Sequence, residues 1–204
     1  SGMRGVVGPI MKIGIPSALE PFSYTIQNFI VSFLIIGLGL AAMGSNTYVN
    51  QIIFLDLTVS WVLTSGGQIL MSHHLGAGKI DMVKRTYRKI AFIIAGFAFA
   101  NLLVYVVFHR FFLGIFTQDE QIIRAGFWIL VIALIMEPVR SINILGGVAL
   151  KTVGDGKFSV IISLVFMWGL VPVIILATKL GWGIVGIWGC LLADEAIRAS
   201  INLW

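Results

Sequence analysis

The chain has 204 residues, of which 58% are hydrophobic and only 11% are charged. Soluble domains carry about 25% charged residues, so this composition excludes an ordinary water-soluble core and predicts a protein embedded in a lipid bilayer. The formal net charge of +5 comes mostly from bases between apolar segments, a pattern typical of membrane topology rather than of nucleic-acid binding.

Six apolar segments follow one another along the chain, each close to the length of about 20 residues that a membrane span needs. We expect the spans at residues 17–38, 47–71, 90–108, 121–150, 158–178 and 183–204. Residues 1–16 are then expected to form a cytoplasmic segment that begins with a cloning remnant, Ser1-Gly2, and residues 17–204 to form one lobe. The predicted fold class is an all-α transmembrane six-helix bundle.

The bases in the links predict the orientation of the chain. Nine bases lie before the first span and in the links after the second and fourth spans, whereas the opposite links hold three. Because basic links stay on the cytoplasmic side, both termini are predicted to be cytoplasmic and the protein to lie in the plasma (inner) membrane.

Polar residues interrupt the first span along one face. At 100° per residue, Glu20, Tyr24, Gln27 and Asn28 fall within one narrow arc. Such a stripe is costly against lipid, so it faces neighbouring helices or a hydrated cavity. Gln27 and Asn28 equally fit hydrogen bonding that only packs the bundle, but an ionisable acid is a poor choice for packing, so Glu20 is a functional candidate.

The fourth span carries an acid, a helix breaker, a base and an amide in one apolar stretch. Glu137 and Arg140 are three residues apart and can pair on one helix face, which Asn143 extends. Pro138 predicts a break that frees backbone carbonyls to line a cavity. The pair makes this segment a candidate ion or substrate site, although a static pair that fixes helix packing is the alternative.

Two further spans carry acids. Asp56 is a deep acid in the second span, with a hydroxyl residue four and eight positions later. In the sixth span, Asp194 and Arg198 are four residues apart, the spacing of a structural salt bridge.

No pattern for an enzyme or a metal site is present. Residues 75–79 and 153–157 resemble phosphate-binding loops but lack the first glycine and the final Ser or Thr of that motif. His73 and His74 are adjacent and point to different helix faces, without a Cys or an acid at ligand spacing. We therefore expect no catalytic residues, no metal and no cofactor.

Several motifs, in order, resemble the multidrug and toxic compound extrusion (MATE) family, most closely its carboxy-terminal lobe. The matching motifs are residues 12–20, 74–79, 137–143 and 149–155, and then 186–188 leading to Asp194 and Arg198. The resemblance implies two six-helix lobes around a central cavity, and export of organic cations against inward sodium or protons. It also implies that Glu20, Glu137, Arg140 and Asn143 line the cavity. Some members place the acid of the first helix a turn deeper, where this chain has Tyr24.

The mechanism we expect is competition for shared carboxylates. Glu20 and Glu137, with Asp56, would hold sodium, a proton or an organic cation, between walls formed by Phe22, Tyr24, Phe29 and Met136. The partner would be a second six-helix lobe, which is another copy, a separate chain or a removed half. Two alternatives stay open: a lipid-carrier flippase of the same superfamily, and a membrane scaffold or fragment that transports nothing.

Overall fold

The computed structural model describes residues 2–202, and the side chains of residues 18–202. Ser1, expected to be a cloning remnant, and the end of the sixth predicted span at residues 203–204 lie outside the described residues. The described chain forms seven helices and no strands, and their bounds are α1 (Gly2–Ile36), α2 (Leu40–Gly76), α3 (Ile80–Val107), α4 (His109–Gly114), α5 (Glu120–Thr152), α6 (Gly156–Lys179) and α7 (Gly183–Asn202).

The six predicted spans correspond to the six long helices, and the all-α transmembrane fold is confirmed. Sequence reasoning missed α4, a helix of six residues between α3 and α5. α1 already begins at Gly2, so residues expected to form a separate segment continue the helix, although the part apolar enough to cross a bilayer begins at Ala18.

Within residues 2–202, five helices are long and apolar enough to cross a membrane. α7 is also 20 residues long, but it contains Asp194, Glu195 and Arg198. All three of these side chains are buried and form ion pairs, so their charges are held away from the lipid-facing surface. The outward surface is rich in large apolar side chains such as Phe29 and Phe92, as expected of a protein surrounded by lipid.

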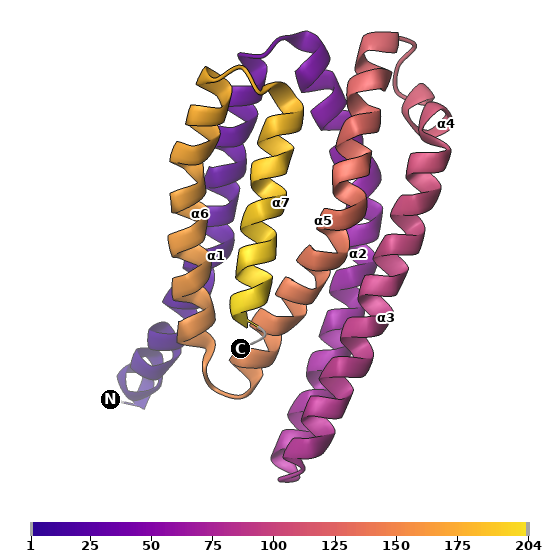
Figure 1. Cartoon of the computed structure of the whole chain (residues 1–204). Coiled ribbons are helices and arrows are strands. Elements are labelled where there is room, and N and C mark those ends of the chain that lie inside the picture. Colours follow the sequence, from indigo (N-terminus) through magenta and orange to yellow (C-terminus); the bar gives the residue numbers. More distant parts are fainter. Residues whose placement is uncertain (1, 203–204) are drawn as a thin grey trace.

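α5 is the central helix of the bundle. It packs against α2 and α3 on one side and against α6 and α7 on the other, while α1 packs mainly against α6 (Figure 1). Its fully buried residues Ile129, Leu130 and Met136 belong to a core shared with Val49 of α2 and Ile187 of α7.

The break predicted at Pro138 is wrong, because α5 is helical from Glu120 to Thr152 with the proline inside it. Figure 1 instead shows α5 changing direction along its length, with its two ends leaning toward different neighbours. Proline removes one backbone hydrogen bond and bends a helix, and packing on both sides of α5 holds the two halves together.

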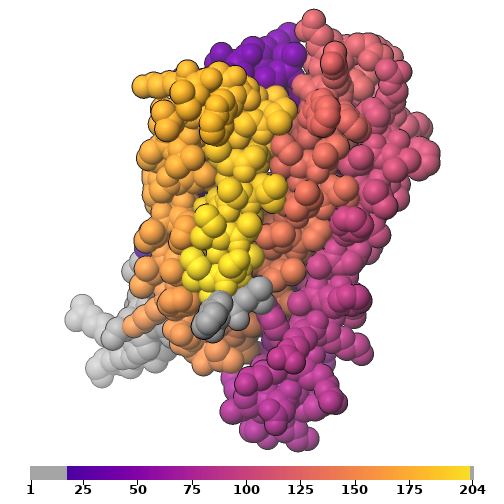
Figure 2. Space-filling model, viewed as in Figure 1, coloured from indigo at the N-terminus to yellow at the C-terminus, as the bar shows by residue number. Residues whose placement is uncertain are grey.

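The α2–α3 hairpin extends beyond the other helices at the lower end of the molecule. With a rise of about 1.5 Å per residue, the 37 residues of α2 measure roughly 55 Å, more than the 40–45 Å or so of a bilayer with its headgroups. Figure 2 shows the tip of this hairpin below the ends of α5 and α6. The tip is therefore placed at the level of the headgroups or beyond them.

Candidate functional site

Two adjoining grooves lie between helices of the bundle. The lower groove, of about 380 Å³, is lined by α1, α2, α5, α6 and α7 and includes Glu20 and Lys151. The upper groove, of about 470 Å³, is lined by α1, α2, α5 and α7 and includes Asn46. The two grooves share five lining residues, namely Tyr24, Leu57, Arg140, Glu195 and Arg198.

A network of charges connects α5 and α7 where the grooves meet. The Arg140 Nη1 atom donates to Glu137 Oε1 at 2.7 Å, and its Nε atom donates to Glu195 Oε1 at 3.2 Å. Glu195 Oε2 also accepts from Asn143 Nδ2 at 2.8 Å. Arg198 lies 3.2 Å from Glu195 Oε1. Arg140 therefore joins an acid of its own helix to an acid of α7.

This network is almost completely removed from bulk water. The Glu137 side chain is 0% exposed, and the Glu195 and Arg198 side chains are 7% exposed. Buried charges persist only when they are paired and hydrogen-bonded, and these pairs meet that condition. Asp194 pairs with Arg198, as its spacing predicted, so three acids face two bases and the formal charge of the network is −1.

The first-helix stripe borders both grooves. Glu20 lines the lower groove and Asn28 the upper, while Tyr24 lines both. Glu20 Oε2 accepts a hydrogen bond from Lys151 Nζ at 2.6 Å, which ties α1 to the end of α5. Gln27 is buried and donates to the backbone oxygen of Met167 in α6 at 3.1 Å, a packing contact that also borders the upper groove.

The deep acid Asp56 lies apart from the grooves. It is fully buried, and its Oδ1 atom accepts from Asn101 Nδ2 of α3 at 3.2 Å. Its Oδ2 atom has no hydrogen-bond partner, and the same is true of Glu137 Oε2. Neither carboxylate lines either groove, so the structure places Glu137 behind Arg140 rather than on the groove wall.

The expected aromatic and methionine walls are wrong in three of four cases. Phe22 and Phe29 are 64% and 75% exposed, Met136 is fully buried, and none of them lines a groove. The two phenylalanines are about 200° and 180° around α1 from Glu20, so they point away from the polar stripe. The apolar walls are built instead by other residues, namely Met43, Phe54, Trp61, Met167 and Trp188.

Sequence reasoning missed the central position of Glu195. The spacing of Asp194 and Arg198 drew attention to a pair along α7, whereas Glu195 reaches across to Arg140 and Asn143 of α5. The signal in the sequence was Glu195 itself, a third charged residue next to Asp194 that the pair of Asp194 with Arg198 does not account for. Asn202 of α7 extends the same network by donating to Asn143 Oδ1 at 2.6 Å.

Comparisons with known proteins place this architecture among transporters. The family model MatE matches residues 16–176. An uncharacterized transporter of Bacillus subtilis, YisQ, is 32% identical over 194 residues, which are 94% of this chain and 43% of that protein. An uncharacterized transporter of Schizosaccharomyces pombe is 20% identical and is matched over 37% of its length by 97% of this chain. The chain thus spans less than half the length of these relatives.

Solved structures share the fold at low sequence identity. The MATE transporter VcmN of Vibrio cholerae in its bent form has a TM-score of 0.86 and 19% identity, with 99% of this chain matching 46% of that one. The MATE transporter ClbM, solved in complex with Rb+, has a TM-score of 0.87 and 17% identity, with 99% and 47% covered. Each match corresponds to about half of the solved chain.

Proposed function

The chain belongs to the MatE family of membrane transporters, and from that premise we propose that it is half of a secondary antiporter that exports organic cations in exchange for sodium or protons. The observation that carries this proposal is the charged network of α5 and α7 at the meeting point of two grooves. Charges inside a membrane bundle are costly and mark ion or substrate pathways.

The acids buried behind the groove walls favour a positively charged ligand. The walls themselves hold three acids, Glu20, Asp194 and Glu195, and three bases, Arg140, Lys151 and Arg198. The formal excess of two negative charges comes from Asp56 and Glu137, which are fully buried behind the walls. A cation that enters the grooves would reduce this excess. Trp61 and Met167 offer apolar surface beside the acids, which suits a cation with an aromatic or aliphatic body.

We propose different tasks for the two leading acids. Glu20 lies on the groove wall and is 21% exposed, so an organic cation can displace Lys151 from it. Glu137 is screened by Arg140, so it would respond to the ion at Glu195 through the position of the shared guanidinium. Substrate and coupling ion would then compete for one connected set of carboxylates.

α1 and α2 both line the grooves but make few contacts with each other, and we propose that a second six-helix lobe closes the grooves between them. Two-lobe transporters place their binding sites at such lobe interfaces. We propose that the second lobe is another copy or a separate chain, with both in the inner membrane and all termini cytoplasmic. A complex mass equal to one lobe, without transport, would favour the scaffold alternative instead.

The test is ethidium transport into everted membrane vesicles that contain the chain, driven by an imposed sodium or proton gradient. We expect Glu137→Gln and Glu20→Gln to abolish the gradient-driven component. The matched control is Glu120→Gln, because Glu120 is 71% exposed in a surface pair with Arg110 and lines neither groove. Equal transport by the Glu137→Gln and control vesicles would remove Glu137 from the mechanism.

One observation favours the flippase alternative. The lower groove is lined by three bases, Arg140, Lys151 and Arg198, but by only two acids, Glu20 and Glu195. A lipid carrier with a pyrophosphate headgroup needs such bases. Stabilisation of the purified chain against heating by an isoprenoid pyrophosphate, together with no effect of ethidium, would support the flippase over the drug exporter.

A further inference from the structure

A cavity at the lower end of α3 borders the lower groove at Asn202 and joins basic and apolar surfaces. It has a volume of about 410 Å³ and lies between α2, α3, α5 and α7. Lys84 and Arg88, one helical turn apart on α3, line it together with Tyr87. The remaining walls are mostly apolar, and they include Met71, Val83, Ala149, Leu150 and Val153.

Two polar atoms of this cavity are buried without partners. Tyr87 Oη, a donor, and Asn202 Oδ1, an acceptor, are inaccessible and form no hydrogen bond. Both residues line the cavity. Leaving such groups unsatisfied costs free energy. A ligand toward which the two side chains rotate, and which accepts a bond from the phenol and offers a hydroxyl to the amide oxygen, would therefore be favoured.

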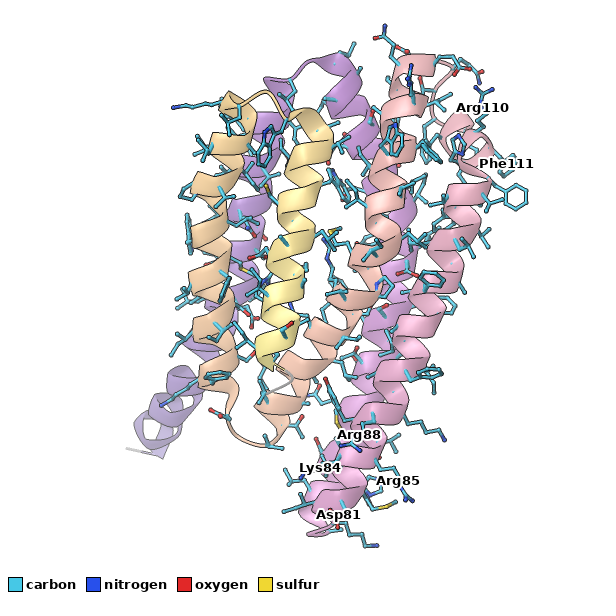
Figure 3. The ribbon with its side chains drawn as sticks, viewed as in Figure 1. Asp81, Lys84, Arg85, Arg88, Arg110 and Phe111 are labelled. Atoms are coloured by element: carbon cyan, nitrogen blue, oxygen red, sulfur yellow. The ribbon has the colours of Figure 1, made fainter. Side chains whose placement is uncertain are left out.

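The surrounding surface is strongly basic. Residues 79–89 contain five bases and one acid, Asp81, a net charge of +4, and all six of these side chains are exposed. Within the described part of the chain, none of these bases forms an ion pair. Figure 3 shows Lys84, Arg85 and Arg88 projecting from the lower end of α3, which the length of α2 places at the headgroup level.

From this combination we infer that the cavity binds one anionic glycerophospholipid of the cytoplasmic leaflet. The lipid phosphate lies between Lys84 and Arg88 and accepts a hydrogen bond from Tyr87, and an acyl chain lies against the apolar wall that includes Met71 and Ala149. A headgroup glycerol, as in phosphatidylglycerol, supplies the hydroxyl that Asn202 lacks. Clusters of bases beside membrane helices attract anionic lipid, and the cavity adds a specific seat for one molecule.

The same bases also set membrane topology, so the test must separate a specific site from a general positive charge. Lys84→Gln with Arg88→Gln removes two bases that line the cavity. Arg85→Gln with Lys89→Gln removes two bases of the same exposed helix segment that do not line it, and this pair is the matched control. Both pairs of substitutions lower the charge of the hairpin equally.

The assay is native mass spectrometry of the purified chain with dioleoyl phosphatidylglycerol, with dioleoyl phosphatidylcholine as the neutral comparison. We expect one tightly bound phosphatidylglycerol and no comparable site for phosphatidylcholine. The double variant Lys84→Gln, Arg88→Gln should bind phosphatidylglycerol about thirty-fold more weakly, because each base contributes about 1 kcal/mol. The control double variant should change the affinity by less than about five-fold.

Tyr87→Phe gives a second and independent readout. It removes a hydroxyl that has no partner without lipid, so it should leave the thermal stability of the lipid-free chain unchanged or higher. With phosphatidylglycerol, the stabilisation should fall by the equivalent of about ten-fold in affinity.

Three results would overturn the inference. One is equal loss of binding in the two double variants, which would indicate diffuse attraction. Another is equal binding of phosphatidylcholine. The last is displacement of the lipid by millimolar inorganic phosphate or glycerol phosphate, which would indicate a site for a soluble anion. None of these outcomes depends on whether the chain transports ethidium.

Discussion

Replacing Arg140 tests whether the buried network holds α5 and α7 together. The substitution Arg140→Met keeps most of the length of the side chain but removes its charge and its hydrogen bonds to Glu137 and Glu195. The two acids are affected differently. Glu195 keeps Asn143 and Arg198, whereas Glu137 is fully buried and loses its one hydrogen-bond partner in the described structure.

The expected magnitude follows from this stranded carboxylate. Removing one partner of a buried ion pair costs about 3–5 kcal/mol. Arg140→Met should fall in this range because the Glu137 carboxylate has no other hydrogen bond within the described residues. Glu137→Gln alone should cost about 1 kcal/mol, because Arg140 keeps Glu195. The double variant Glu137→Gln, Arg140→Met has no stranded charge and should recover at least half of the loss.

The free energy of unfolding can be measured by titrating the chain with sodium dodecyl sulfate in mixed micelles and following the fluorescence of its six tryptophans. The four proteins form a double-mutant cycle, which isolates the coupling between the two side chains. A double variant no more stable than Arg140→Met would refute the reasoning, because it would mean that the Glu137 charge is satisfied without Arg140.

Two further predictions concern α5, the first its packing against neighbouring helices and the second its N-terminal cap. A Cβ atom at Gly126 would lie 2.8 Å from Leu113 Cδ1 and 3.5 Å from Val49 Cγ2. Gly126→Val should therefore lower the free energy of unfolding by about 1–3 kcal/mol. The control is Gly96→Val, which should be close to neutral in the same assay because a Cβ there meets nothing within 4 Å. Asp119 caps α5 by accepting a hydrogen bond from the Gln121 backbone N–H at 2.8 Å. Asp119→Ala should therefore lower the free energy of unfolding by about 0.5–2 kcal/mol, and Asp119→Asn by much less. Equal losses of stability in the two variants would contradict the cap.

The fold was largely predictable because a bilayer constrains length and composition so strongly. Each span needs about 20 apolar residues, and six such segments leave little choice of architecture. α4 escaped prediction because six residues carry no helical period. Pro138 was misjudged because the packing that keeps α5 helical on both sides of it comes from other helices, which no local pattern reveals.

The site was predictable only within single helices. The period of 3.6 residues predicted the stripe of α1 and the pairs Glu137–Arg140 and Asp194–Arg198, since each lies on one helix. The link from Arg140 to Glu195 joins residues 55 positions apart. Periodicity shows which face of a helix is polar, but the neighbour of that face depends on how α5 and α7 are rotated against each other.

The network also explains how α7 can cross the membrane with three charged side chains. The same pairing indicates which helices can move relative to one another. The three charges of α7 would each cost about 2–3 kcal/mol or more at the centre of an isolated span, but all of them pair within α7 or with α5. α5 and α7 should therefore stay together when the bundle changes conformation. Among the described side chains, α1 forms one ion pair with α5, between Glu20 and Lys151 at the groove edge. In the mechanism proposed above, an organic cation that takes Glu20 from Lys151 would release this contact, so we expect the movement that opens and closes the grooves to be concentrated in α1.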